Sequence, residues 1–549
     1  MLYLSRYFWY NHTMKTIDNS LQTIEQLNDK ILCQNDEILI LKQQIAELDA
    51  KVKWYEEQFR LSCQKKYGPS SEKTSPEQIN LFNEAEDIAS PEKAVKEPEI
   101  ETITYQRRKK PAGQREDKLK DLPVEVIEYR LTKDEQVCPC CQGTLHEMST
   151  QVRQEIAVIP PQIKVVKHVQ YIYACRRCEK ENISTPIIKA YMPNPLLPGS
   201  LASPSILAYI MDQKYTNSMP LYRQEAQLTR LGLELSRQTM ANWVLAACDP
   251  WLKLIYDRLH EHLVKRDILH ADETTLQVLK EPGRSAESKS YMWLYRTGRE
   301  GPPIILYEYQ TTRASKHPDK FLSGFRGYLQ TDGYSAYGKL TGITTVGCWA
   351  HARRKFTDAL KALPAASRDN PVAARIGLDY CNKLFAIERR IKELSAYDRY
   401  VKRLEESKPL LDEFYGWLKR QRQHALPKST FGQAVNYCIN QWDELNNFLL
   451  DGRLEIDNNR AERSIKPFVI GRKNFLFSNT PRGASSSAII YSIIETAKEN
   501  KLSPYNYLVY LFEQLPNVDI RDKGVLDSLL PWSDTLPPKC RMPYKDNVN

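Results

Sequence analysis

The chain has 549 residues, of which 42% are hydrophobic, and it carries a formal net charge of +10 with a pI of about 8.8. This length predicts several domains with sizeable cores, and the mild basicity allows a nucleic-acid partner without requiring one. The sequence has no apolar run long enough to span a bilayer, which argues against a membrane-spanning helix and predicts a cytoplasmic protein.

The chain begins MLYLSRYFWYNHT, which is apolar and aromatic but lacks the clean apolar core and small-residue cleavage site of a signal peptide. Met14 would make a sensible alternative start, just before the first expected helix. The twelve cysteines are expected to be reduced thiols or metal ligands rather than disulfides, because the chain looks intracellular.

Residues 14–66 predict a long helix, in which a heptad repeat runs over residues 17–62 without Pro or Gly. β-Branched side chains at the first heptad position, with Leu at several fourth positions, favour a two-stranded parallel coiled coil and therefore a homodimer. The alternative is an amphipathic helix that packs back on its own chain. The first heptad positions are Ile17, Ile24, Ile31, Ile38, Ile45, Val52 and Phe59.

Residues 67–125 have the composition of a flexible charged linker, in which an acidic segment precedes the basic stretch YQRRKKPAGQR. The side chains of Arg107, Arg108, Lys109 and Lys110 are candidates for contacts with a DNA backbone or minor groove. A solvated basic segment without DNA contacts explains the same composition equally well.

Residues 126–195 carry two CxxC pairs and predict a small zinc ribbon. Four thiolates bind zinc tetrahedrally, and the strand-like segment between the pairs would bring them together as a β-hairpin. Such a closed site stabilises a fold and performs no chemistry. Cys140 is spare, or replaces one of the four expected ligands, which are Cys138, Cys141, Cys175 and Cys178.

Residues 196–260 predict a helical region that resembles a helix-turn-helix. The segment PLYRQEAQLTRLGLELSRQTMANWVLAAC indicates a helix, a break at Gly232 and a second helix with Ser236 as N-cap. Helical hairpins without DNA contacts are also common, so the pattern alone does not decide its role. If the second helix enters a DNA groove, its candidate contacts are Arg237, Gln238 and Asn242.

Five strand-like segments predict a mixed sheet with packed helices, in a domain of residues 261–515. The first, ILHADETTLQVL, carries Asp272 and Glu273 in an apolar run, where carboxylates are costly unless paired or metal-bound. Asp332 follows the fourth segment. Two acids near neighbouring strands could share Mg²⁺, which prefers carboxylate and water oxygens.

A third acid is expected to complete this site from a helix. The segment LEIDNNRAERSIKP predicts a helix capped by Asp457 or Asn458, with Glu462 one turn in. The other acids of this segment, which suit capping or surface positions better, are Asp451, Glu455 and Asp457.

Basic side chains flank the expected acids and would suit a phosphodiester backbone, although they could instead pair with the acids. Cys348 and His351 form a half-site of two ligands, for which we expect a supporting role rather than metal binding. The basic candidates are Arg353, Arg354, Lys355, Arg460, Arg463, Lys466, Arg472 and Lys473.

Two further segments complete the expected organisation. Residues 355–450, rich in Lys, Arg, Glu and Leu, predict a helical insertion between the strands and the helix of Glu462. Two C-terminal helices follow, the second with Ser503 as N-cap and Pro504 as its first residue, and residues 516–549 are expected to form a tail.

Several motifs together resemble the transposases of the insertion-sequence-66 family over most of the chain. The combination is far more specific than any one motif, although the basic stretch reads PAGQR and lacks the clean RGR core of an AT-hook. The motifs are the zipper-like N-terminus, KKYGPSSEK, the two CxxC pairs, PLYRQE, HADETTLQVL, TDGYSAY, GCWAHARRKF and IDNNRAERSIKPFVIGRKNFLFS.

The resemblance implies a multidomain α+β protein whose catalytic domain is RNase H-like, with a DDE triad of Asp272, Asp332 and Glu462. It implies a bacterial, nucleoid-associated transposase that uses Mg²⁺ or Mn²⁺ to cleave element ends and join the 3′-hydroxyl to target DNA. Terminal-repeat and target DNA are the implied partners, and accessory proteins of the same element can be required as well.

Two other functions fit part of these features. A DNA-binding regulator would use the zipper, the zinc ribbon and the helix-turn-helix without catalysis, and a metal-dependent nuclease would cut DNA without joining it. Three acids at a basic site argue against the regulator. The residues alone do not separate cutting from joining, because both reactions use the same metals.

Overall fold

The residues that this computed structural model describes are 162–174, 187–364, 372–542 and scattered helical positions between Lys30 and Glu56. They divide into two compact units. The larger unit includes Asn194–Gln224 and Arg237–Cys540, and the smaller unit includes Glu225–Ser236 and the described residues from 162 to 193.

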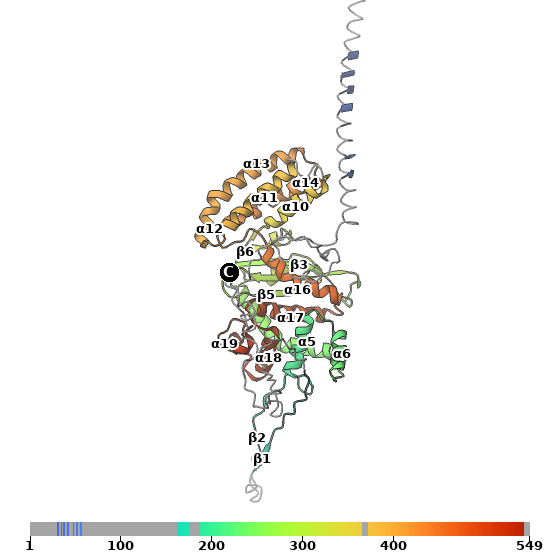
Figure 1. The fold of residues 1–549 in the computed structure, drawn as a ribbon, viewed down its shortest axis with the longest axis vertical. Coiled ribbons are helices and arrows are strands. Elements are labelled where there is room, and N and C mark those ends of the chain that lie inside the picture. The colour runs from blue at the N-terminus through green and yellow to red at the C-terminus, as the bar shows by residue number, and fades with distance from the viewer. Residues whose placement is uncertain are drawn as a thin grey trace, which may run out of the picture. The chain divides into compact units, whose positions relative to one another are not determined.

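A five-stranded mixed sheet forms the centre of the larger unit (Figure 1). Its strands are β3 (Ile268–Gln277), β4 (Lys289–Thr297), β5 (Ile305–Gln310), β6 (Gly327–Gln330) and β7 (Ile343–Val346). The strand order is β5-β4-β3-β6-β7, in which β4 is antiparallel to both neighbours and β6 is parallel to both of its own. The mixed sheet expected from the sequence is therefore confirmed.

The other described elements are mostly helices. They are α5 (Pro204–Tyr215), α6 (Leu221–Arg230), α7 (Arg237–Ala247), α8 (Lys253–Leu263), α9 (Lys316–Phe321), α10 (Trp349–Ala362), α11 (Ala373–Arg390), α12 (Ala396–Lys402), α13 (Lys408–His424), α14 (Thr430–Asn440), α15 (Trp442–Asn446), α16 (Asn459–Phe475), α17 (Pro481–Glu499), α18 (Pro504–Gln514) and α19 (Lys523–Ser528). Helices α10, α11, α13 and α14 gather beyond β6, while α17, α5 and α18 gather beyond β5 (Figure 1).

Side chains cover both edges of the sheet, which protects backbone groups that would otherwise pair with another chain. At the β5 edge, the Ile305 amide donates to Thr496 Oγ1 at 3.0 Å and the Tyr307 amide donates to Ser492 Oγ at 2.7 Å, both acceptors belonging to α17. At the β7 edge, Asn447 Nδ2 donates to the Thr345 carbonyl at 2.8 Å.

The helical insertion shares a core with the sheet. Buried aromatic side chains of α10 and α13, among them Trp349, Phe356 and Phe414, form one cluster that also contains Val346 of β7. Because the cluster is continuous, the insertion is held to the sheet by apolar packing over its whole base.

The C-terminal residues pack more extensively than the expected tail. Ser503 caps α18 through the Asn506 amide, with Pro504 at the first position, as the sequence predicts. Beyond it, α19 supplies Asp527, which accepts hydrogen bonds from Arg258 at 2.6 and 2.7 Å. Cys540 is buried. A short charged helix of this kind gives little periodic signal, so the sequence did not indicate its contacts.

In the smaller unit, strands β1 (Ile172–Ala174) and β2 (Ile187–Lys189) pair antiparallel. Residues 175–186, which join them and contain the second CxxC pair, lie outside the described residues. The first CxxC pair and the basic stretch at 107–110 lie outside them as well. No described helix is long and apolar enough to cross a membrane.

The described N-terminal positions are helical and carry the apolar residues of the heptad repeat. These side chains are exposed, for example Ile38 at 47% and Ile45 at 60%. Among the described residues of this chain, none covers these apolar side chains. A helix that pairs with another chain requires such exposed apolar positions at heptad spacing.

Candidate active site

Asp272 lies in β3, and Asp332 lies two residues beyond the end of β6, the parallel neighbour of β3. The last paired residues of β3 and β6 are His270 and Gln330, each two residues before an aspartate, and the charge of Asp332 acts on Asp272. Gly333 follows with a φ of 86°, which favours glycine and turns the chain immediately after the acid. The pairing of the strands therefore brings the two expected acids together.

The expected acids interact electrostatically. Burial raises the pKa of Asp272 well above its usual range, and the negative charges of Glu273, Asp332 and Glu462 raise it further. A hydrogen bond from the Glu273 amide at 2.8 Å lowers it only in part. Carboxylates crowded in this way repel one another unless a proton or a cation neutralises them.

Alternate side chains of β3 face α16. His270 Nδ1 lies 3.0 Å from Asn458 Oδ1, and Arg472 Nη1 donates to Thr274 Oγ1 at 3.2 Å. Because side chains alternate along a strand, Asp272 between them faces the same helix.

Glu273 faces the other side of the sheet, where its carboxylate is paired. It accepts hydrogen bonds from Tyr337 Oη at 2.5 Å and from Arg313 Nε at 2.8 Å. The Arg313 guanidinium stacks 3.5 Å from the ring centroid of Tyr334, whose amide donates to Asp332 Oδ1 at 3.0 Å. Glu273 thus supports the turn that carries Asp332, and Asp272 is the better candidate for a metal ligand.

Glu462 lies in the first turn of α16, close to the start of α10. His351 Nδ1 lies 3.8 Å from its Oε1 and Arg354 Nη2 lies 3.5 Å from its Oε2. Glu462 Oε1 and His351 Nδ1 are both buried without a hydrogen-bond partner. Cys348 Sγ is near enough to complete a three-ligand group, and burial raises the pKa of this thiol to about 12, so it is protonated when no metal is bound.

Asn458 positions the start of α16 in a way that its sequence did not indicate. Its side chain does not cap the helix: Nδ2 donates to the Ala271 carbonyl at 2.8 Å, and Oδ1 meets His270. Its amide donates to Cys348 Sγ at 3.2 Å. Asp457 instead accepts from the Asn459 amide at 3.1 Å. An asparagine beside a helix start is typical of a cap, so only the packing distinguishes the two roles.

The alternative acids are held by other groups. Asp451 pairs with Arg453 at 2.9 Å, and Glu455 pairs with Arg299 at 2.5 Å. Burial raises the pKa of Asp457, and the charge of Glu455 contributes to the increase. Two of the three are therefore neutralised by arginines.

The basic residues of α16 separate into two groups. Arg463, Lys466 and Lys473 are exposed and recur at a spacing that sets them on one face of the helix. Arg460 pairs with Glu455 at 3.0 Å, and Arg472 is bonded to β3. The first group is available to a phosphate backbone, whereas the second contributes to the fold.

Helix α10 adds further positive charge beside Glu462. Arg353 and Arg354 are exposed, and the Lys355 ammonium lies 4.9 Å from the ring centroid of Tyr437. Together α10 and the first half of α16 bring exposed basic groups close to Glu462, as a site for an anionic polymer requires.

Helix α7 starts at Arg237, directly after the expected cap Ser236. Gln238 Nε2 donates to Asn242 Oδ1 at 3.0 Å. All three candidate DNA contacts on this helix, Arg237, Gln238 and Asn242, are exposed.

Comparison with known families decides the classification. The family model described as "Transposase IS66 family" matches residues 199–486, more than half of the chain. The chain belongs to the IS66 transposase family. Three further matches are a zinc-finger binding domain of IS66 transposase at residues 135–179, "Transposase C of IS166 homeodomain" at 54–127 and the IS66 C-terminal element at 492–532.

Similar proteins occur in Sinorhizobium fredii (strain NBRC 101917 / NGR234). The chain is 30% identical to uncharacterized protein y4jD over 73% of this chain and 78% of the relative. It is 31% identical to uncharacterized protein y4hP over 72% and 73%, and 31% identical to uncharacterized protein y4qI over 74% and 75%. These names assign no activity.

Membership of the IS66 transposase family implies transposition as the class of activity and DNA as the partner. The zinc-finger match contains both CxxC pairs, which supports a structural zinc. The 54–127 match covers the whole segment that the composition predicts to be a linker, residues 67–125.

Proposed function

We propose that this chain is a DDE transposase that cleaves the ends of its element and joins them to target DNA, with Asp272, Asp332 and Glu462 as the triad of an RNase H-like domain. The observation that carries the proposal is the parallel pairing of β3 with β6, whose last pair, His270 and Gln330, lies two residues before each aspartate. The contacts of α16 with the same face of β3 support Glu462 as the third member.

The residues of this site fit two divalent cations, Mg²⁺ or Mn²⁺. The donors are carboxylate oxygens, the pKa of Asp272 is raised by burial and neighbouring acids, and Glu462 Oε1 lacks a partner. Bound metals would activate the attacking water or 3′-hydroxyl and stabilise the leaving oxygen.

DNA contacts would follow the exposed basic groups. Arg463 and Lys466 on α16 and Arg353 and Arg354 on α10 are close in sequence to Glu462 or its partner His351 and would hold the strand by its phosphates, and Lys473 at the far end of α16 would extend this track. The exposed side chains of α7 and the basic stretch at 107–110 would supply additional DNA contacts.

The N-terminal helix would pair two copies of the chain. Its exposed heptad residues support a parallel coiled coil, and two copies would allow the two ends of one element to be held in a single complex. Accessory proteins of the same element would join this complex.

The test is cleavage and strand transfer on labelled terminal-repeat DNA with Mg²⁺ or Mn²⁺, comparing wild type with Asp272→Asn, Asp332→Asn and Glu462→Gln. Each change should reduce both reactions to background while DNA binding persists. Asp443→Asn removes an exposed acid of the insertion and serves as the matched control.

Three outcomes would contradict parts of the proposal. An active Glu462→Gln variant would exclude Glu462 as the third ligand and make Asp457 the next candidate. Cleavage without a joined product would indicate a nuclease. Binding of the ends without cleavage under either metal would favour a DNA-binding regulator.

A further inference from the structure

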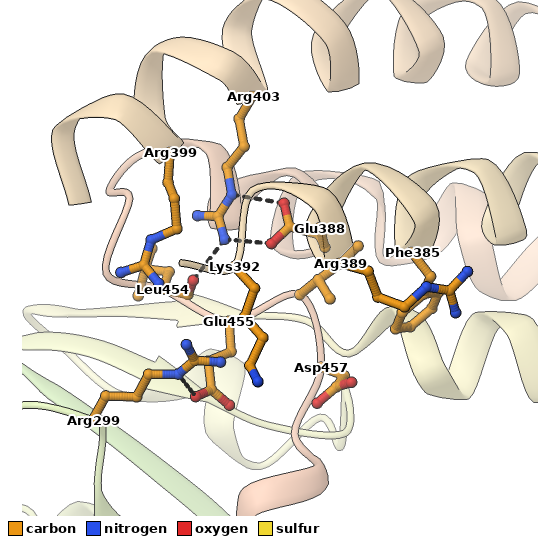
Figure 2. Close-up of a pocket in the computed structure, with 11 residues that line it drawn as sticks. Arg299, Phe385, Glu388, Arg389, Lys392, Arg399, Arg403, Leu454, Glu455 and Asp457 are labelled. Atoms are coloured by element: carbon orange, nitrogen blue, oxygen red, sulfur yellow. Dashed lines mark hydrogen bonds and ion pairs between the residues drawn. The ribbon is translucent and has the colours of Figure 1, made fainter. Parts of the chain in front are cut away.

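A pocket of about 160 Å³ lies between the helical insertion and the segment that leads into α16 (Figure 2). This volume is far more than one water molecule needs. Its wall contains more basic than acidic side chains, and none of the basic ones belongs to the groups around the acid site. The basic residues are Arg299, Arg389, Lys392, Arg399 and Arg403.

Two of these cations are already neutralised. Arg403 is buried and donates to both oxygens of Glu388 at 2.8 Å. Arg299 donates to Glu455 at 2.5 Å, as Figure 2 shows. Both pairs build the wall of the pocket, so neither arginine is free to bind a ligand.

The wall has three other cations, Arg389, Lys392 and Arg399. They outnumber its one remaining acid, Asp457. Arg399 Nε is buried without a hydrogen-bond partner. Lys392 has one weak ion pair, with exposed Glu393 at 3.6 Å. A buried donor without an acceptor among crowded cations is costly unless an anion completes the arrangement.

We propose that this pocket binds a phosphate group of the DNA strand on which the acid site acts, an inference that rests on the proposed function. Phosphate oxygens accept charge-assisted hydrogen bonds from guanidinium and ammonium groups, which are the free groups here.

The position of the pocket favours DNA as the source of the phosphate. One wall, Leu454 to Asp457, continues directly into the start of α16. The charge of Asp457 interacts with that of Glu462, so the pocket adjoins the acid site. A strand held at the acids would therefore extend to the pocket along its own backbone.

The experiment measures how binding of the full chain to labelled terminal-repeat DNA depends on salt, with Ca²⁺ in place of Mg²⁺. Lys392→Gln and Arg399→Gln are tested singly and together. In the double variant, the plot of log K (the association constant for DNA) against log salt should be less steep by about 0.7 to 0.9. This change corresponds to the loss of one phosphate contact. Arg422→Gln removes an exposed arginine of α13 in the same insertion and should leave the slope unchanged.

Lys392→Gln changes an exposed side chain and should leave the fold intact, so a smaller slope in this variant indicates a lost DNA contact. If every variant had the wild-type slope and still cleaved DNA, the proposal that the pocket binds a DNA phosphate would be overturned. The proposed function would stand. A wild-type chain that neither binds nor cleaves the ends would overturn both.

A third arm separates DNA from a free phosphate compound. Thermal unfolding is recorded with inorganic pyrophosphate. Protection of the wild type that the double variant loses, together with an unchanged DNA slope, would assign the pocket to a free phosphate and overturn the DNA proposal. A less steep salt dependence of DNA binding in the double variant would support the DNA proposal.

Discussion

Asn458 and His270 are hydrogen-bonded through their side chains at 3.0 Å, although 188 residues separate them. Both are buried, Asn458 completely. Because Asn458 precedes α16 and His270 lies in β3, their contact sets the start of the helix beside Asp272 and determines where Glu462 stands.

Asn458→Ala should lower the free energy of unfolding by about 2–3 kcal/mol, because it leaves His270 Nδ1 and the Ala271 carbonyl unpaired. Urea unfolding measures the change, and metal-dependent cleavage should also fall under conditions where the variant stays folded. Asn474→Ala removes an exposed amide that donates to the Ser218 carbonyl and should cost less than about 0.5 kcal/mol. Equal costs for both variants would contradict the positioning role.

Asp272→Asn should stabilise the metal-free chain at neutral pH. The folded pKa of Asp272 is raised, so the folded state binds its proton more tightly than the unfolded state does. The wild type therefore loses stability as the pH rises from about 4, the pKa of Asp272 in the unfolded chain, through its pKa in the folded chain. The loss is about 1.4 kcal/mol for each unit by which the two pKa values differ. Unfolding in EDTA between pH 4 and 8 should show this fall in the wild type and a weaker one in the variant. If the stabilities of the wild type and the variant changed in parallel with pH, folding would not raise the pKa of Asp272.

Mg²⁺ should raise the melting temperature of the wild type and not that of Asp272→Asn. A cation that binds only the folded chain adds about 2.7 kcal/mol at a concentration 100 times its Kd. Asp443→Asn should keep the full response, since that acid is exposed on α15. A response that Asp272→Asn retains would place the Mg²⁺ elsewhere.

Arg403→Leu should destabilise the chain by about 3–5 kcal/mol, because it leaves Glu388 without its buried partner. Arg403 also donates to the carbonyls of Phe448, Asp451 and Leu454. Chemical unfolding is the measurement.

Arg390→Leu is the matched control for Arg403→Leu. It breaks the exposed ion pair with Glu406 and should cost less than about 1 kcal/mol. If the two losses were similar, burial would not be what makes the Arg403 pair important.

Ile38→Asp combined with Ile45→Asp should convert a dimer into a monomer. Both side chains are exposed heptad positions, and a charge at each would be buried in a coiled coil. Light scattering after size exclusion measures the mass. Lys42→Asp changes a helical position outside the apolar repeat and should remain dimeric. A monomeric wild type would contradict the coiled coil.

Local patterns in the sequence determined the elements of the fold. The five strands, the helical insertion and the Ser503–Pro504 start of α18 follow from periodicity and capping, which act over a few residues. The motifs around Asp272, Asp332 and Glu462 also indicated the family, which the match over residues 199–486 confirms.

Only the tertiary structure decided how these elements serve the site. The pairing of Glu273 with Arg313, the contact of Asn458 with β3 and the pocket beside Arg399 each join residues far apart in the chain. Such contacts depend on how a strand and a helix pack together. A short stretch of sequence specifies its own element but contains no information on the side chain that it will meet.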